Sequence, residues 1–285
     1  MNIIGKWNQN QYKILGLIGK GNFGKVYKVK DAKGNCLAIK LSQELLSLTN
    51  EYNGLVEFQN MDFVPNVYDF DDWENGGELW HFIVMDYIVG KDLGEISRSH
   101  SLENRHVFKI GLALLNILRK IDSLGYKYTD IKLENIILDK NGYIHLIDYG
   151  SLIKKDQPTK EYTQIYNINC WNTKPNYNHT IAILFSINMI MLSLIAKVEY
   201  NPIIYDLDEI LNKIHKLPLK TEEKAFLING FKGKFKTFDK YYISLYNLIN
   251  KSNYKKLDKI DYILIGSIVS FVFIVFISIK KFFIY

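Results

Sequence analysis

The sequence predicts an α+β fold: a small antiparallel sheet with one helix, a larger and mainly helical part, and one transmembrane helix near the C-terminus. Alternating apolar residues around glycine-containing turns indicate strands before residue 90, and apolar residues at helical spacing follow. The run that begins at Tyr262 and ends at Ile279 has no charged residue, which indicates a membrane span. With 285 residues, of which 48% are hydrophobic, the chain can bury a large core. Wholesale disorder and a small disulfide-stapled fold are therefore excluded.

The first 90 residues carry the strand pattern. Turn-forming glycines at Gly19, Gly21 and Gly34 separate the first apolar stretches. After the third stretch, Leu48 and Leu55 recur at helical spacing. The predicted elements are strands over 12–18, 25–29, 36–40, 67–70 and 80–85, and a helix within 42–58.

The helical part begins after residue 90. Apolar positions over 103–124 predict a mostly buried helix that Gly125 ends. Two short apolar pieces, 136–138 and 143–147, flank an Asp-Lys-Asn-Gly turn and predict a hairpin. The segment 181–196 is uncharged and apolar nearly all round. At 16 residues we interpret it as the central buried helix of this part rather than as a second membrane span.

The membrane span sets the expected topology. Its 18 residues would make a helix of about 27 Å, enough for a hydrocarbon core. Four lysines lie just before the run and only Lys280 and Lys281 follow it, so the positive-inside bias places the N-terminal part in the cytoplasm. The first 11 residues lack a signal-peptide core. We expect a single-pass protein of the cell membrane with a short C-terminal tail, 280–285, outside.

The net charge of +6 comes from 33 Lys and 3 Arg against 30 acidic residues, a skew typical of AT-rich coding. Between Lys232 and Lys259, however, eight lysines face only two aspartates and alternate with aromatic residues. Anionic lipid headgroups or nucleic acid could bind such a segment. A solvated face of the last helix is the simpler interpretation, and all three stay open.

Two features of the sequence are typical of a site that binds a nucleoside triphosphate. Gly19, Gly21, Gly24 and Val26 form a GxGxxGxV pattern between two predicted strands, where glycine lets backbone amides approach phosphates. A Rossmann site would need a helix directly after the glycines, whereas a strand over 25–29 is predicted here. Lys40 ends the next apolar strand and needs an anion. Its best partner is Glu51, on the apolar face of the predicted helix, with Glu44 as the alternative.

The most specific stretch is Asp130-Ile-Lys132-Leu-Glu-Asn135, followed by the hairpin and then Asp148-Tyr-Gly. The order GxGxxGxV, AxK, DxKxxN, DxG resembles the eukaryotic-like (Hanks-type) Ser/Thr protein kinases of bacteria, in the group anchored by a single C-terminal transmembrane helix. The resemblance implies a bilobal fold. The expected domains are a kinase domain over 10–250 with lobes 10–88 and 89–250, a basic juxtamembrane segment over 251–261, the span 262–279 and the tail 280–285.

The resemblance also implies roles for these residues. Asp130 would accept the proton of a substrate hydroxyl, Lys132 would stabilise the migrating phosphoryl group, and Asn135 and Asp148 would hold Mg²⁺, with Mn²⁺ as an alternative. Met85 would be the gatekeeper residue of the adenine pocket, and the backbone of Asp86 and Ile88 would contact adenine. The residues expected around ATP are Ile18, Gly19, Gly21, Gly24, Val26, Ala38, Lys40, Glu51, Met85, Asp86 and Ile88.

Several positions depart from the family pattern. Thr129 stands where the family has an arginine that receives an activation-loop phosphate, and Tyr149 replaces a phenylalanine. The phenol fits that pocket if its hydroxyl reaches solvent or a partner. The Ala-Pro-Glu triplet that ends the family's activation segment is missing, although Thr163 could contact the catalytic loop. Asn178 replaces an acid and can cap a helix.

The sequence therefore favours an active, Mg–ATP-dependent Ser/Thr protein kinase that phosphorylates proteins and itself, with Ser151, Thr159 and Thr163 as acceptors. A nucleotide-binding pseudokinase scaffold is the alternative, which the missing arginine and glutamate favour. A small-molecule phosphotransferase is the third. Expected partners are protein substrates, the membrane, and a second copy of the chain in a homodimer.

Overall fold

The computed structural model describes residues 1–21, 24–99, 102–159, 162–171 and 178–251. The chain divides into two compact units, Met1–Leu245 and Tyr246–Tyr285. Of the second unit, only residues 246–251 are described, and they end the last helix. The predicted span 262–279, the tail after it and most of the juxtamembrane segment lie outside the described residues and stay predictions.

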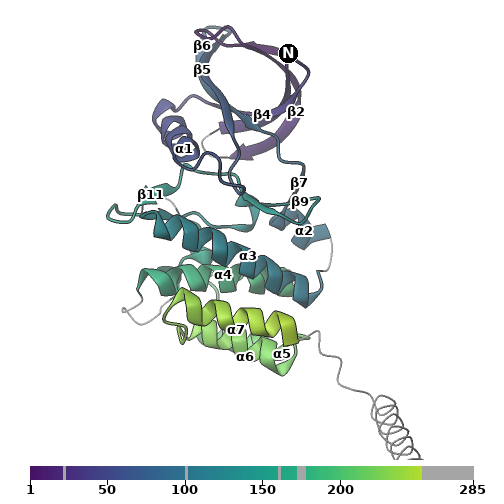
Figure 1. Ribbon diagram of the computed structural model, residues 1–285, viewed down its shortest axis with the longest axis vertical. Coiled ribbons are helices and arrows are strands. Elements are labelled where there is room, and N and C mark those ends of the chain that lie inside the picture. Colours follow the sequence, from purple (N-terminus) through teal and green to yellow (C-terminus); the bar gives the residue numbers. More distant parts are fainter. Residues whose placement is uncertain (22–23, 100–101, 160–161, 172–177, 252–285) are drawn as a thin grey trace, which may run out of the picture. The chain divides into compact units, whose positions relative to one another are not determined.

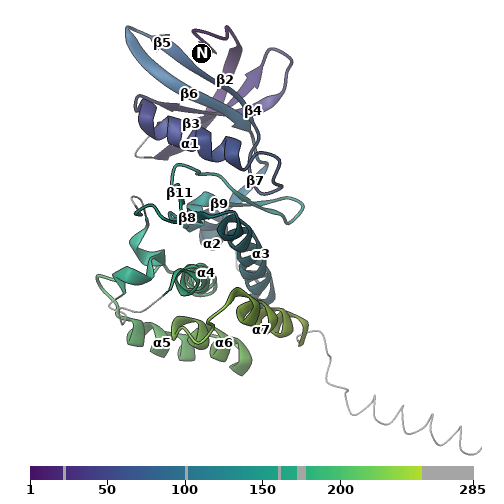
Figure 2. The same cartoon turned by 60° about the vertical axis from the view of Figure 1, so that its left-hand side comes forward.

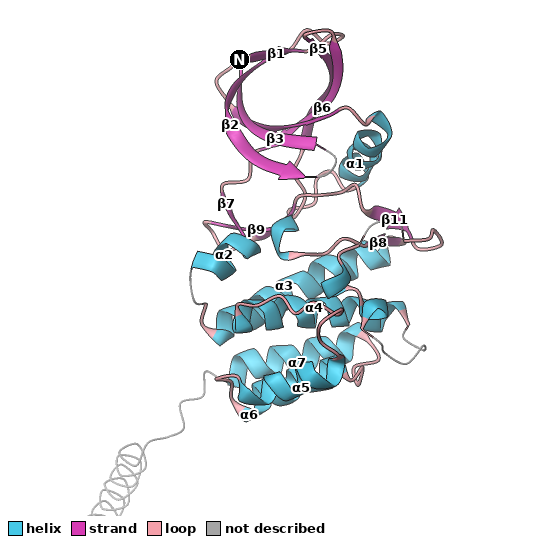
Figure 3. Ribbon diagram, turned by 180° about the vertical axis from the view of Figure 1, so that it is seen from behind, coloured by secondary structure: helices cyan, strands magenta, loops and turns pink. Residues whose placement is uncertain are grey.

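The N-terminal lobe is a six-stranded antiparallel sheet with the strand order β1-β2-β3-β4-β6-β5. Figure 3 shows these strands curving into a ring, with α1 (Leu45–Glu57) outside it. The interior of the ring is apolar, and Ile3, Tyr12, Ile39 and Phe82 are among its buried residues. The strands are β1 (Asn2–Ile4), β2 (Gln11–Gly21), β3 (Gly24–Asp31), β4 (Cys36–Ser42), β5 (Val67–Asn75) and β6 (Glu78–Asp86).

The C-terminal lobe is mainly helical and carries short strands on the side that faces the sheet (Figure 1). Its helices are α2 (Leu93–Ser99), α3 (Asn104–Ser123), α4 (His179–Ala196), α5 (Leu207–Lys216), α6 (Thr221–Phe231) and α7 (Phe238–Lys251). Its strands are β7 (Gly90–Asp92), β8 (Tyr126–Tyr128), β9 (Ile136–Asp139), β10 (Ile144–Leu146) and β11 (Leu152–Lys154). The pairing of β9 with β10 is the predicted hairpin, and Gly142 takes the positive φ of its turn.

The helix α4 is the centre of this lobe, as the sequence predicts. It packs against α3 and α6, and Figure 2 shows it between α3 and the pair α5 and α6. Within the described part of the chain, α4 alone is long and apolar enough to cross a membrane, but most of it is buried inside the fold. The side chain of Asn178 caps it by accepting a hydrogen bond from the backbone of Ile181 at 2.9 Å. The helix is therefore a core element.

The N-terminal segment joins the sheet more closely than the boundary at residue 10 suggests. The strand β1 pairs with β2, and the Lys6 N–H donates to the Asp72 carbonyl oxygen at 2.8 Å, so the segment bridges β2 and β5. The buried carboxylates of Asp69 and Asp71 accept hydrogen bonds from the backbone or side chains of residues 7, 8 and 10. A strand of three residues has little pattern of its own, which is why the sequence did not predict β1.

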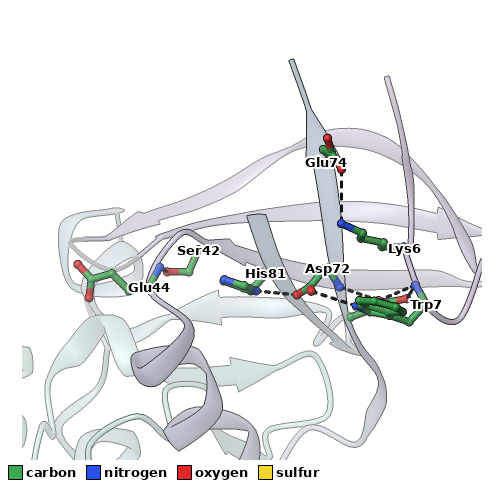
Figure 4. A network of polar contacts seen from close by, with 8 residues as sticks. Lys6, Trp7, Ser42, Glu44, Asp72, Glu74 and His81 are labelled. Carbon is green, nitrogen blue, oxygen red and sulfur yellow. Dashed lines mark hydrogen bonds and ion pairs between the residues drawn. The ribbon is translucent and has the colours of Figure 1, made fainter. Parts of the chain in front are cut away.

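Figure 4 shows the polar contacts at this edge of the sheet. Trp7 Nε1 donates to Asp72 Oδ2 at 3.0 Å, and His81 Nδ1 lies 2.6 Å from Asp72 Oδ1. Burial raises the pKa of Asp72, but the hydrogen bonds from His81 and Trp7 outweigh it and hold this pKa below its usual value. Lys6 pairs with Glu74 at 3.5 Å nearby. These contacts tie the first turn of the chain to β5 and β6.

Candidate active site

The predicted lysine–glutamate pair is formed. Lys40 lies on β4 opposite Val26 and Ile83, and its ammonium bonds the carboxylate of Glu51, which is 2% exposed on α1. The other predicted partner, Glu44, lies at the N-cap of α1, where its N–H donates to Ser42 Oγ at 3.0 Å. The pair therefore links the sheet to the helix.

The glycine-rich turn joins β2 to β3. Gly19 faces Val26 and Gly21 faces Gly24 across the ladder, and residues 22–23 at its tip lie outside the described part. A Cβ on Gly24 would collide with the backbone oxygen of Leu41, whereas a Cβ on Gly21 would meet nothing within 4 Å. Gly24 is therefore needed by the fold. Gly21 leaves open space beside it, which suits a bound phosphate.

The residues expected around adenine lie on adjacent strands. Ala38 and Met85 face each other across β4 and β6, and both are buried. Asp86 ends β6, and its carboxylate accepts hydrogen bonds from Asn66 N at 2.9 Å and from the Tyr68 hydroxyl at 2.7 Å. The second bond raises the pKa of Tyr68 to about 12. This carboxylate is engaged, and the Asp86 N–H donates to the Asn66 carbonyl oxygen at 3.0 Å. The contact of the Asp86 backbone with adenine stays a prediction. Two further predicted contacts, Ile18 and Val26, lie on β2 and β3, and Ile88 follows β6.

Asp130 is held through its carboxylate and through its backbone. Its Oδ1 accepts a hydrogen bond from Thr163 Oγ1 at 2.7 Å, and its Oδ2 accepts one from Lys132 Nζ at 2.5 Å. Asn135 Nδ2 donates to the Asp130 carbonyl oxygen at 2.9 Å, and the Asp130 N–H donates to Ser151 Oγ at 3.2 Å. The Asp130 side chain is 13% exposed, and these contacts fix its orientation.

The predicted metal residues are Asn135 and Asp148. Asn135 is 5% exposed, and because its amide nitrogen donates to Asp130, its Oδ1 is the end available to a cation. Asp148 Oδ1 accepts from the Gly150 N–H at 3.1 Å, which orients this carboxylate. Amide and carboxylate oxygens completed by phosphate and water are what Mg²⁺ prefers. The residues present therefore fit the metal.

The catalytic loop and the segment after Asp148 are joined by neutral contacts where the family has an arginine. Thr129 Oγ1 donates to the Ser151 carbonyl oxygen at 2.9 Å. Ser151 is 3% exposed and its hydroxyl is engaged by Asp130, so in this conformation it is shielded from a kinase. Thr163 is likewise bonded to Asp130, while Thr159 is exposed. Of the three predicted acceptors, Thr159 is therefore the one that this conformation exposes.

Tyr149 fills the pocket expected for a phenylalanine, but it does so without the polar partner that the sequence analysis required. Its ring is 0% exposed and lies 6.0 Å from the ring of Tyr128. Among the described residues, neither hydroxyl has a hydrogen-bond partner. Burial raises the pKa of both phenols far above the usual value.

We expect Tyr149→Phe to raise the free energy of unfolding by about 1 kcal/mol, because it removes a buried hydroxyl that lacks a partner. Urea unfolding followed by tryptophan fluorescence measures the change. Tyr143→Phe is the matched control, since that ring is 67% exposed, and it should change stability by less than about 0.5 kcal/mol. A destabilised Tyr149→Phe variant would mean that the hydroxyl is hydrogen-bonded after all.

No sequence pattern indicated the side chains that fix the end of the activation segment. Tyr166 and Trp171 are each 1% exposed and anchor residues 163–171 to the C-terminal lobe. Tyr166 bonds Glu199, which lies beyond α4. Only the bulk of the two aromatic residues in a polar stretch could have indicated them, because their partners are distant in the sequence.

A curved sheet with a lysine–glutamate pair, set on a helical lobe that presents Asp130, Lys132 and Asn135, defines a protein kinase. The chain belongs to this family: the family model described as protein kinase domain matches residues 12–238. It is a serine/threonine protein kinase. The comparisons thus confirm the Hanks-type resemblance, and the C-terminal anchor stays a prediction.

Among known proteins, the chain is similar to serine/threonine-protein kinase YabT of Bacillus subtilis (strain 168), with 29% identity over 248 residues, which cover 83% of this chain and 71% of that protein. It is also similar to citron rho-interacting kinase of Rattus norvegicus, with 29% identity over 50% of this chain and 7% of that protein. Ribosomal protein S6 kinase alpha-3 of Homo sapiens shows 32% identity over 51% of this chain and 20% of its own length. The chain thus spans only a small part of these two mammalian kinases.

Proposed function

We propose that this kinase transfers the γ-phosphoryl group of Mg–ATP to serine and threonine hydroxyls of proteins, and to itself, at the cytoplasmic face of a membrane. The observation that carries the proposal is the orientation of Asp130. Thr163 and Lys132 each hold one of its carboxylate oxygens, at 2.7 and 2.5 Å, while the Lys40–Glu51 pair is closed in the other lobe. Phosphoryl transfer depends on positioning and charge neutralisation, and these contacts provide both.

Each residue would act through atoms already in place. Glu51 holds Lys40, whose Nζ would bind the ATP phosphates. Asp130 would accept the proton of the substrate hydroxyl on a carboxylate oxygen, and Lys132 Nζ would stabilise charge on the transferred group. Asn135 and Asp148 would hold Mg²⁺, which neutralises phosphate charge when bound. Adenine would lie between Ala38, Val26 and Ile18, near Met85, with the backbone of Asp86 and Ile88.

A pseudokinase scaffold is the second candidate, and two observations favour it. Thr129 makes neutral contacts at the position of the family's arginine. The buried hydroxyls of Tyr128 and Tyr149, which lie close to Asp148, have no hydrogen-bond partner among the described residues. Such a protein would bind nucleotide and signal through a partner without transferring phosphate. Against it, the residues for phosphate, metal and hydroxyl contacts are all present.

Transfer of radiolabelled γ-phosphate separates the two candidates. The full chain, in vesicles with Mg–ATP and a generic basic protein, should label that protein and itself, and Lys40→Ala should lower the rate at least about 10-fold by removing the phosphate ligand. Lys216→Ala, at an exposed position on α5, is the matched control and should keep full activity. Nucleotide binding without any transfer by the unaltered chain would favour the scaffold.

The location and partners are also part of the proposal. The apolar run 262–279 would anchor the kinase in the membrane, and the lysines from Lys232 to Lys259 would meet anionic lipid or nucleic acid. Within the described part of that basic segment, Tyr241 is 0% exposed, so its ring is not available to stack on bases. The ring of Tyr246 is 48% exposed, and the exposed lysines remain for phosphate contacts. Assays with neutral vesicles, anionic vesicles and DNA would distinguish these partners, and the protein concentration dependence would test a homodimer.

A further inference from the structure

The end of the activation segment, residues 163–171, is fixed to the C-terminal lobe by two buried aromatic residues. Trp171 Nε1 donates to the Ile165 carbonyl oxygen at 2.8 Å, and its ring lies 6.2 Å from that of Phe185 on α4. Ser186 Oγ, also on α4, donates to the Tyr166 carbonyl oxygen at 2.7 Å. The segment therefore has a fixed path over α4 although the family's anchoring glutamate is absent.

The side chain of Tyr166 continues this contact to the loop after α4. Its hydroxyl donates to Oε1 of Glu199, an exposed residue, while the ring itself is 1% exposed. A hydrogen bond from a buried phenol to a carboxylate is stronger than a neutral one. Burial and the nearby Glu199 charge both raise the pKa of Tyr166, so the phenol stays protonated and remains a donor.

The backbone of the same tyrosine contacts Thr163. The Tyr166 N–H donates to the Thr163 carbonyl oxygen at 3.1 Å across a single 3-10 turn, Gln164–Tyr166. Thr163 Oγ1 in turn lies 2.7 Å from Asp130 Oδ1. A continuous set of contacts thus runs from Glu199 through Tyr166 and Thr163 to Asp130. A shift of the tyrosine would move the threonine that orients the carboxylate.

We propose that Tyr166 and Glu199 are positioning residues for phosphoryl transfer: their hydrogen bond holds Thr163 against Asp130 and so sets the orientation in which Asp130 meets the substrate hydroxyl. This inference rests on the role proposed above for Asp130. The bond takes the place of the missing glutamate as the polar anchor of the segment. A loss of this bond impairs the protein-substrate step and leaves nucleotide binding, which uses the other lobe, unaffected.

The test is steady-state kinetics of the full chain with a protein substrate. Tyr166→Phe keeps the buried ring and removes the donor, and it should lower kcat/KM for the protein substrate about 10-fold. The Kd for ATP should stay close to that of the unaltered chain, and the melting temperature should stay well above the assay temperature. Tyr162→Phe, at a tyrosine directly before this segment that is 45% exposed, is the matched control and should have no effect.

Variants of Glu199 test the partner at an exposed position where folding is not at risk. Glu199→Ala should match Tyr166→Phe, and Glu199→Gln, which keeps an acceptor oxygen, should restore most of the activity. The double variant Tyr166→Phe/Glu199→Ala should be no worse than either single one, because both remove the same bond.

Three results would overturn the inference: full activity of Tyr166→Phe, additive losses in the double variant, or a fall in kcat/KM matched by weaker ATP binding. The unaltered chain serves as the reference for the proposed function itself. An unaltered chain that transfers no phosphate overturns that function, whereas an active chain whose Tyr166 and Glu199 variants are equally active overturns this inference alone.

Discussion

Asp130→Asn is expected to lower kcat for phosphoryl transfer to a protein substrate by about 10³-fold, with the Kd for ATP changed by less than about twofold. The amide cannot accept the proton of the substrate hydroxyl, and it replaces the charged partner of Lys132 with a neutral one. The contacts of the backbone of Asp130 with Ser151 and Asn135 do not involve the changed atoms, so the loop should keep its fold. Radiolabel transfer gives kcat, and nucleotide fluorescence gives the Kd.

The matched control is Asp156→Asn, an exposed carboxylate in the turn after β11. It changes the charge by the same amount and should leave kcat within about twofold, because surface charges remote from the reacting atoms contribute little. A variant at position 130 that kept more than a tenth of the normal kcat would exclude Asp130 as the proton acceptor. Its role would then be limited to holding Lys132 and Thr163.

The largest expected effect on stability follows from deleting residues 1–10. The deletion removes four hydrogen-bond donors to buried carboxylates: Trp7 N and Asn8 N from Asp71, and the amides of Asn8 and Asn10 from Asp69. Hydrogen bonds to charged groups contribute about 1.5–3 kcal/mol each, and losing the core residue Ile3 removes roughly 2 kcal/mol more. Such a loss approaches the whole stability of a typical domain, about 5–15 kcal/mol.

Thermal unfolding of the full chain and the deletion variant, followed by circular dichroism in detergent, measures this loss. The N-terminal lobe of the shortened chain should not unfold as a cooperative unit. A shortened chain with an unchanged melting temperature would show that the first ten residues are dispensable.

Two glycine substitutions provide a local control for the same contacts. A Cβ at Gly5 would meet the carboxylate of Asp71, whereas a Cβ at Gly16 would meet nothing within 4 Å. Gly5→Ala should therefore destabilise the lobe by about 1–3 kcal/mol, and Gly16→Ala should be neutral within about 0.5 kcal/mol. Equal effects of the two changes would contradict the packing of this segment on β5.

Much of the site could be predicted because its residues act through local spacing. Glu51 lies on the apolar face of α1, since Leu48 and Leu55 flank it at helical intervals, and this periodicity brought it to Lys40. Asp130, Lys132 and Asn135 lie within six residues, so the bonds among them need only one short turn. The hairpin of β9 and β10 likewise depends on a turn whose chemistry is visible in four residues.

Other features could not be predicted, because their partners come from distant parts of the chain. The alternation of lysine and aromatic residues after Phe231 left three interpretations open: a solvated helix face, a lipid contact or a nucleic-acid contact. None of them predicted that Tyr241 turns inward, where its hydroxyl donates to Asn188 at 3.0 Å. The sequence showed which residues alternate and not which face the core would cover. Burial of an aromatic ring is favourable because it removes apolar surface from water, but which ring is buried depends on the packing of the folded chain.

By itself, the sequence determined the order of the kinase motifs, the lobe in which each lies and the pairing of Lys40 with a helix glutamate, because periodicity and turn chemistry act over a few residues. The expected contact of Thr163 with the catalytic loop is present, as a bond to Asp130. Only the tertiary structure decided that β1 joins the sheet and that Tyr166 meets Glu199 across 33 positions. A three-residue strand or a single 3-10 turn has no period to detect. Such elements exist because a neighbour supplies their hydrogen bonds and covers their apolar side chains, and that neighbour is known only once the chain has folded.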